Sequence, residues 1–122
     1  MREAGQLEKD VNNVTLTGTV VGEPTLMQGR VNVPRLSFTL EQVRGGSKAV
    51  PHRFRCVAFG PLALDARELV ASGRRLLVVG ELAESRAKEF ARRGRPGSSQ
   101  LGSSMEVKVL EIDALRTRVE DG

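Results

Sequence analysis

The chain of 122 residues contains no tryptophan and no tyrosine, and it has only four phenylalanines. It also has a single cysteine, so no disulfide bond can form within the chain, and a single histidine. Its apolar runs fall short of the roughly 18 residues that a membrane-spanning helix needs. The start, MREAGQLEKD, contains no hydrophobic segment of the signal-peptide type. We therefore expect a cytoplasmic protein with no membrane partner.

Residues for catalysis or metal binding are equally scarce. His52 lies beside Pro51 at the start of an expected strand, and Cys56 lies in the apolar part of that strand, where we expect a buried core residue. Neither belongs to a metal-ligand spacing such as Cys-x-x-Cys, and no stretch matches the phosphate-binding pattern Gly-x-x-x-x-Gly-Lys-Ser/Thr. We expect no enzymatic activity, no metal and no cofactor.

The segment from residue 52 to residue 82 gives the clearest indication of the fold. Alternating and β-branched residues predict a strand near 52–59, and Pro61 suits the first turn of a helix at about 61–72. Gly73 suits a left-handed end of that helix, and a strand is expected at 75–82. The helical side chains expected to face the protein are Leu62, Ala66, Leu69 and Val70.

Three further strands are expected near 13–21, 35–43 and 104–113. The Gly-Glu-Pro sequence at 22–24 is expected to end the first of them, and Gly18 to permit a sharp bend on its buried side. In the second strand the side chains expected to face the core are Leu36, Phe38 and Leu40. The alternation in the last strand does not decide which side is buried. One side is formed by Met105, Val107, Val109 and Glu111, and the other by Glu106, Lys108, Leu110 and Ile112.

Five strands with a single helix between the third and the fourth predict an all-β fold, the five-stranded OB-fold barrel, which often binds single-stranded nucleic acid. A chain of this length provides one such domain. We expect a flexible N-terminal arm at 1–11, the barrel domain at 12–115 and a short C-terminal tail at 116–122.

The basic residues are placed unevenly. They outnumber the acidic ones by 19 to 15 over the chain, and they gather between residues 24 and 55 and again between 83 and 104. The second stretch is rich in glycine and serine and is expected to be a long mobile loop. This distribution favours a polyanionic partner, although charges that merely solvate loops would give the same pattern.

Five segments carry a family resemblance: NNVTLTGTVVGEP at 12–24, FTL at 38–40, RCVAFG at 55–60, LVASGRRLLVVGEL at 69–82 and MEVKVLEI at 105–112. In this order and spacing they resemble the bacterial single-stranded DNA-binding proteins of the SSB family over roughly residues 12–113. The chain is also similar to primosomal replication protein N, an SSB-derived protein with the same barrel. The resemblance implies an OB-fold that binds single-stranded DNA as a dimer or tetramer.

SSB proteins usually stack bases on several aromatic side chains, and most of those positions are not aromatic here. The matched positions fall near Gly46, at Arg53 and near Ala87, so that an aromatic residue is kept at Phe59 alone. Phe54 is one position off, which would put it on the other face of the strand, and we expect it in the core. Whether Phe54 or Phe59 is the stacking residue depends on this register.

Arginine is expected to replace the missing aromatic residues. Arg53 and Arg55 share a strand face with Phe59 by period-two alternation, and a guanidinium can both stack on a base and contact phosphate. Such binding is expected to depend strongly on salt. The candidate nucleic-acid-binding residues are Arg35, Arg44, Lys48, Arg53, Arg55, Phe59, Arg86, Lys88, Phe90, Arg92 and Arg93.

Two functions fit these observations. The first is a non-enzymatic single-stranded DNA-binding protein of replication, repair or recombination. The second is a primosome-type or other protein-interaction module that binds single-stranded DNA or RNA weakly. RTRVEDG at 116–122 lacks the acidic, phenylalanine-ended tip with which SSB proteins recruit replication and repair proteins, so partners of that kind are not expected to bind through it. An open strand edge at 14–21 favours a dimer or tetramer.

Overall fold

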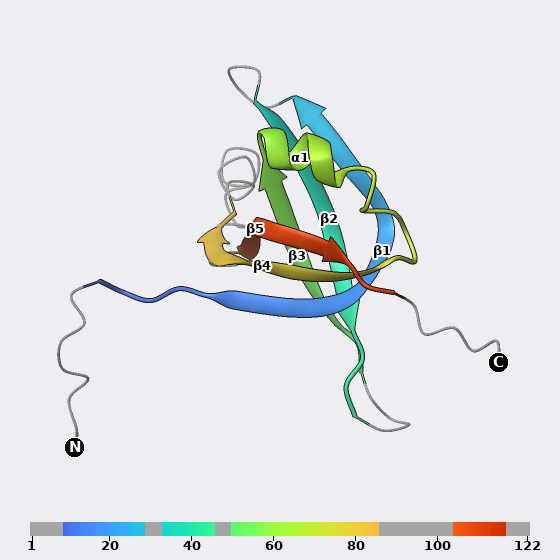
Figure 1. The fold of residues 1–122 in the computed structure, drawn as a ribbon. Helices are drawn as coiled ribbons and strands as arrows, with labels where there is room; N and C mark the ends of the chain where they lie inside the picture. Colours follow the sequence, from blue (N-terminus) through green and yellow to red (C-terminus); the bar gives the residue numbers. More distant parts are fainter. Residues whose placement is uncertain (1–8, 29–32, 46–49, 86–103, 117–122) are drawn as a thin grey trace, which may run out of the picture.

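The structure, a computed structural model, describes residues 9–28, 33–45, 50–85 and 104–116. Within these ranges five strands close into a barrel in the order β1-β2-β3-β5-β4, and one short helix follows β3 (Figure 1). This confirms the predicted OB-fold barrel. The elements are β1 (Val14–Gln28), β2 (Pro34–Gln42), β3 (His52–Phe59), α1 (Pro61–Ala66), β4 (Arg75–Glu84) and β5 (Met105–Ala114).

The interior of the barrel is filled by side chains that alternate along each strand with outward-facing ones. On β2, Leu36, Phe38 and Leu40 are at most 4% exposed, as their period-two spacing predicts. Cys56 on β3 is also buried, as predicted. Burial of this apolar surface is the main favourable term in folding. The other members of the core are Val20, Ala58, Ala63, Ala66, Val70, Leu76, Val78, Val107 and Val109.

Strand β1 bends around the barrel and pairs with two neighbours. Its first part, from Val14 to Thr19, pairs with β4, and its later part pairs with β2. Between Val21 and Thr25 the register shifts, because Gly22 adopts a positive φ of 78° and a β-bulge forms there. The prediction that the strand ends at 22–24 is wrong: the bulge interrupts the pairing, which resumes at Thr25 and continues to Gln28.

Asn12 extends the pairing of β1 with β4 by one side chain. Its Nδ2 donates a hydrogen bond to the Leu82 carbonyl at 2.9 Å, and the Leu82 amide donates to Asn12 Oδ1 at 2.9 Å. The side-chain amide thus forms the same two bonds that a strand residue would form with its backbone. The asparagine at the start of the Asn-x-Val-x-Leu-x-Gly pattern therefore has a structural role.

Two glycines allow close approach of neighbouring strands. A Cβ at Gly18 would lie 2.8 Å from the Glu41 carbonyl oxygen on β2, and a Cβ at Gly80 would collide with the Lys108 carbonyl on β5. Gly18 does lie on the buried side, as predicted, and the approach of Glu41 is the reason that a side chain cannot be accommodated there.

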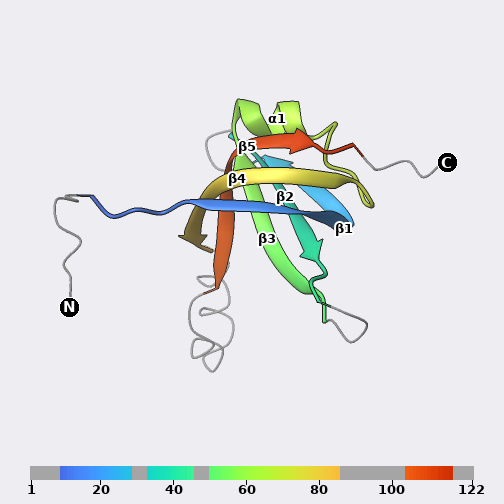
Figure 2. The ribbon, with the colours of Figure 1, turned by 60° about the horizontal axis from the view of Figure 1, so that its bottom comes forward.

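Helix α1 packs against β2, β3 and β5 at one end of the barrel (Figure 2). It is shorter than the predicted 61–72. After Ala66 the chain forms turns, in which the Leu69 and Val70 amides both donate to the Ala66 carbonyl, and the Gly73 amide then donates to the Val20 carbonyl on β1 at 2.8 Å. The predicted inward face is confirmed, since Ala66 and Val70 are buried and Leu62 and Leu69 pack on the core. No helix in the described ranges could span a bilayer.

Strand β5 contains a second irregularity, opposite Val79 and Gly80. Val79 pairs with Glu111 and Gly80 pairs with Val109, so Leu110 has no partner on β4. This extra residue reverses the alternation: Val107 and Val109 are buried before it, and Ile112 and Ala114 pack on the core after it. The expectation that Glu111 shares a side with Val109 is therefore wrong, and Glu111 is exposed.

The domain boundaries stay predictions. Residues 1–8 of the expected arm and residues 117–122 of the expected tail lie outside the described residues.

Candidate nucleic-acid interface

Side chains on the outward side of β2 and β3 form cross-strand pairs. We use the name outer face for these pairs together with the outward residues of the neighbouring part of β1. The pairs are Arg35 with Phe59, Ser37 with Val57, Thr39 with Arg55 and Glu41 with Arg53. Val57 is fully buried despite its position on this side, so it adds no exposed surface to the outer face. The same register pairs half-buried Phe54 with buried Leu40 on the inward side. The pairing therefore brings Phe59, and not Phe54, to the outer face, where it is 40% exposed.

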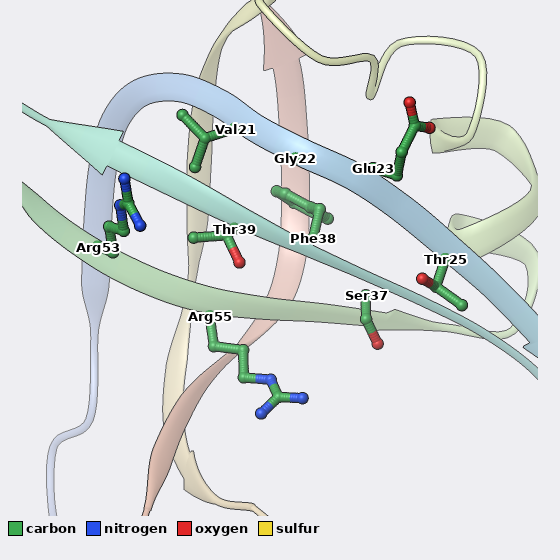
Figure 3. A pocket seen from close by; sticks show the side chains of 9 residues that line it. All are labelled: Val21, Gly22, Glu23, Thr25, Ser37, Phe38, Thr39, Arg53 and Arg55. Carbon is green, nitrogen blue, oxygen red and sulfur yellow. The ribbon is translucent and has the colours of Figure 1, made fainter.

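A polar groove of about 620 Å³ lies on the outer face beside the β1 bulge. The strand bends away from β2 there, which opens the space between β1 and the β2–β3 pair. Figure 3 shows the two arginines near one end of the groove and Glu23 and Thr25 near the other. The lining residues are Val21, Gly22, Glu23, Thr25, Ser37, Phe38, Thr39, Arg53 and Arg55.

The groove combines hydroxyl groups with positive charge. Thr25, Ser37 and Thr39 each offer a donor and acceptor, and arginine guanidinium groups recognise phosphate well. Most contacts between proteins and nucleic-acid backbones use these kinds of side chain. The groove is thus chemically suited to an extended, anionic chain that carries polar sugars.

The two arginines of the groove differ in their surroundings. Arg53 Nε donates to Glu41 Oε2 at 3.1 Å, which offsets part of its charge, while 66% of its side chain remains exposed. Within the described residues Arg55 forms no ion pair, and its side chain is exposed. Arg55 therefore presents the less compensated positive charge to solvent.

Phe59 is covered in part by its neighbour on β2. Arg35 Cζ lies 6.0 Å from the centre of the Phe59 ring, at the outer limit of a cation–π contact. Arg35 Nη2 also lies 3.9 Å from Oε1 of Glu106, a residue that is only 6% exposed. Glu106 is one residue of this surface that the sequence did not indicate, because the buried side of β5 was left open.

The other candidates are not gathered in this groove. Arg44 lines a second hollow of about 340 Å³ with Arg75, whose Nη1 donates to Thr19 Oγ1 at 3.3 Å. Arg75 was not among the predicted site residues, although it lies on the outward side of β4 opposite Thr19. The remaining candidates, Lys48, Arg86, Lys88, Phe90, Arg92 and Arg93, lie outside the described residues.

Groups of ligands for a metal ion are missing from the described part of the chain, where no three His, Cys, Asp or Glu side chains lie together. His52 is exposed at the start of β3.

Cys56 lies on the inward side of β3, behind this interface. Burial raises the pKa of its thiol to about 12, and the negative charge of Glu106 acts in the same direction. Its Sγ lies 3.7 Å from the Phe54 carbonyl oxygen, to which it donates a weak hydrogen bond. The thiol is therefore neutral at ordinary pH and serves as an apolar core group.

The closed barrel and its polar, arginine-bearing face define an OB-fold domain of the class that binds single-stranded nucleic acid. The chain belongs to the single-strand binding protein family, whose sequence model matches residues 11–109. This confirms the resemblance stated from the motifs. No curated protein sequence matches the chain.

Two solved structures show the same fold. The SSB domain of a Synechococcus protein superposes with a TM-score of 0.61 at 18% identity, covering 87% of this chain and 98% of that one. The protein priB from Ralstonia solanacearum superposes with a TM-score of 0.62 at 16% identity, covering 87% of this chain and 100% of that one. At these identities the likeness concerns the fold alone.

The raised pKa of Cys56 predicts a loss of stability in alkali. Between about pH 9 and pH 12 the thiol ionises in the unfolded chain but not in the folded one. The unfolded state then binds fewer protons, so the free energy of unfolding falls as pH rises, by up to about 1.4 kcal/mol per pH unit from this group. Urea denaturation followed by circular dichroism should show a steeper fall for the wild type than for Cys56→Ala. Equal pH dependence in the two proteins would contradict a raised pKa.

Proposed function

We propose that this chain is a non-enzymatic single-stranded DNA-binding protein of replication, repair or recombination, which holds the strand mainly by contacts between arginine and phosphate. The observation that carries the proposal is the polar groove, where Arg53 and Arg55 stand beside a row of hydroxyl side chains on the outer face. Membership of the single-strand binding protein family supports it. In this role the protein works in the cytoplasm with replication or repair proteins as partners.

The charged and the uncharged residues of the groove contribute differently to binding of the strand. Arg55 has no ion pair within the described residues, so it is the main phosphate contact, and Arg53 contributes less because Glu41 shares its charge. Each phosphate that the protein neutralises releases counterions from the strand, which makes affinity fall as salt rises. Thr25, Ser37 and Thr39 contact the backbone and sugars without adding to this salt dependence.

Aromatic stacking contributes less to the free energy of binding than it would in a barrel rich in tryptophan. Among the phenylalanines in the described residues, Phe38 is buried, Phe54 faces inward beside Leu40, and Phe59 is exposed on the outer face. Phe59 therefore supplies the stacking surface on this part of the barrel. Lys48, Arg86, Lys88, Phe90, Arg92 and Arg93 remain candidate contacts from the segments outside the described residues.

A second candidate function is a protein-interaction module with weak binding to single-stranded DNA or RNA. It is favoured by two acidic side chains beside the arginines: Glu23 lines the groove, and Glu41 pairs with Arg53. Hydroxyl groups and backbone contacts without base readout would also accept RNA. Weak binding that is equal for DNA and RNA oligomers would favour this function over the first.

Self-association is part of the proposal. From Val14 to Gly18 strand β1 pairs with β4 on one edge, and its pairing with β2 on the other edge begins only at Thr19. The Thr17 carbonyl on that free edge accepts from Gln42 Nε2 at 2.9 Å. The rest of the edge pairs with no other strand of the described ranges, so its backbone groups are available to a second copy.

Sedimentation equilibrium at micromolar concentration should therefore give a dimer or a tetramer of the 13.3 kDa chain. Thr17→Pro places a residue without an amide in this edge and should shift the equilibrium toward the monomer. A wild type that sediments as a monomer would contradict the proposal of self-association.

Titration of a fluorescent oligo-dT at several salt concentrations tests the binding function. Arg55→Ala should weaken binding and reduce the magnitude of the slope of log K against log salt by about one unit, and Arg53→Ala should do so to a smaller extent. Phe59→Ala should lower affinity by about 1–3 kcal/mol and leave the slope nearly unchanged, because stacking releases no ions. Arg67→Ala, on the exposed end of α1, is the matched control. Binding that does not respond to salt, or that is lost equally in the control, would overturn the proposal.

A further inference from the structure

Arg35 differs from the other arginines of the outer face because it contacts both an aromatic ring and a buried carboxylate. Its guanidinium lies over the Phe59 ring on one side and forms an ion pair with Glu106 on the other. Its side chain is 28% exposed, compared with 66% for Arg53. Arg35 therefore lies against the barrel, with part of its side chain still exposed.

Glu106 depends on this contact. The residue is only 6% exposed, and its Oε1 atom has no hydrogen-bond partner among the residues that the structure describes. The ion pair at 3.9 Å with Arg35 is the compensating charge that the structure shows for it. If Arg35 swung away to a phosphate, a buried carboxylate would be left without a counter-charge, which is strongly unfavourable.

The positive charge of Arg35 is thus already compensated by the Glu106 carboxylate. A phosphate placed against Arg35 would approach the Glu106 carboxylate as well, and the two negative charges would repel each other. A nucleobase is neutral, and its flat face stacks well on a guanidinium plane. The surroundings of Arg35 therefore favour a base over a phosphate.

The cross-strand register extends this flat surface by one residue. Met27 on β1 pairs with Arg35, which in turn pairs with Phe59, so the three side chains form one row across the outer face. Met27 is 51% exposed and Phe59 is 40% exposed. A thioether, a guanidinium and a phenyl ring are all surfaces that pack against an aromatic ring.

We propose that Met27, Arg35 and Phe59 form a nucleobase site, in which a base of the bound strand stacks on the Arg35–Phe59 pair and Glu106 positions Arg35. Arg35 acts there as a stacking plane and not as a phosphate contact. The inference rests on the proposed binding of single-stranded DNA and assigns to Arg35 a role different from that of Arg55.

The test compares oligo-dT with an abasic oligomer of the same length, each titrated over a range of salt. Arg35→Ala should lower the affinity for oligo-dT by roughly fivefold or more, the loss of one stacked base, with little change for the abasic oligomer and no change in the salt slope. Arg35→Lys keeps the charge without the plane and should not restore binding. Arg55→Ala, the matched control on the same face, should weaken both oligomers and lower the slope by about one unit.

Glu106→Gln tests the positioning role, since it keeps the shape of the side chain and removes its charge. Arg35 is then free to reach a phosphate, so the slope should rise by up to about one unit. In that background Arg35→Ala should lower the slope, which it does not do in the wild type. Circular dichroism melts of each variant establish that the barrel is folded, and the Glu106→Gln background avoids leaving a buried carboxylate unpaired.

Two results would overturn the inference alone: a fall in slope for Arg35→Ala like that of Arg55→Ala, or full affinity in Arg35→Lys. A wild type that binds neither oligomer at low salt would instead overturn the proposed function, and this inference with it.

Discussion

Antiparallel pairing of β2 with β3 determines which side chains of both strands enter the core and which reach the groove. Leu36, Leu40 and Cys56 point inward, and Arg35, Thr39 and Arg55 point outward. Because the side-chain period of a strand is two, a slip of one residue would exchange the two sets. It would bury arginines and expose leucines, so the hydrophobic core itself keeps the arginines on the outer face.

Much of the fold could be predicted from the sequence because the inward and outward residues of each element repeat with a fixed period. The alternation of Leu36, Phe38 and Leu40, and the spacing of Ala66 and Val70 after Pro61, follow from local periodicity. The ends of the elements were harder to predict because they depend on tertiary contacts. The helix ends early where the following turn bonds to β1, and β1 continues through Gly22 because β2 is there to pair with Thr25. Leu110 is similar: its unpaired position depends on how β4 meets β5.

The candidate site shows the same division. The shared side of Arg53, Arg55 and Phe59 follows from counting along one strand, and it could be predicted. The pairing of Arg35 with Glu106 could not, because it needs the parallel neighbour relation of β3 and β5, which joins residues far apart in the sequence. Arg75 was missed for a related reason, since its place opposite Thr19 depends on the β1–β4 register.

Acidic residues give the arginines of the outer face different roles. Glu41 forms an ion pair with Arg53, Glu106 lies 3.9 Å from Arg35, and Arg55 forms no ion pair within the described ranges. With the roles proposed for Arg55 and Arg35, a face with a modest excess of positive charge offers one strong phosphate contact and a separate stacking surface. We propose that the single-stranded ligand lies across β2 and β3 on this face.

The central claim is that the outer face, and not another surface of the barrel, holds single-stranded DNA. Amide chemical shifts of the ¹⁵N-labelled protein, recorded while an oligo-dT is added, test it most directly. The account predicts the largest changes at residues 35–41, 53–59 and 21–25, which form the outer face and the groove. Changes confined to α1 and the outward side of β4 and β5, with the β2–β3 pair unaffected, would contradict it.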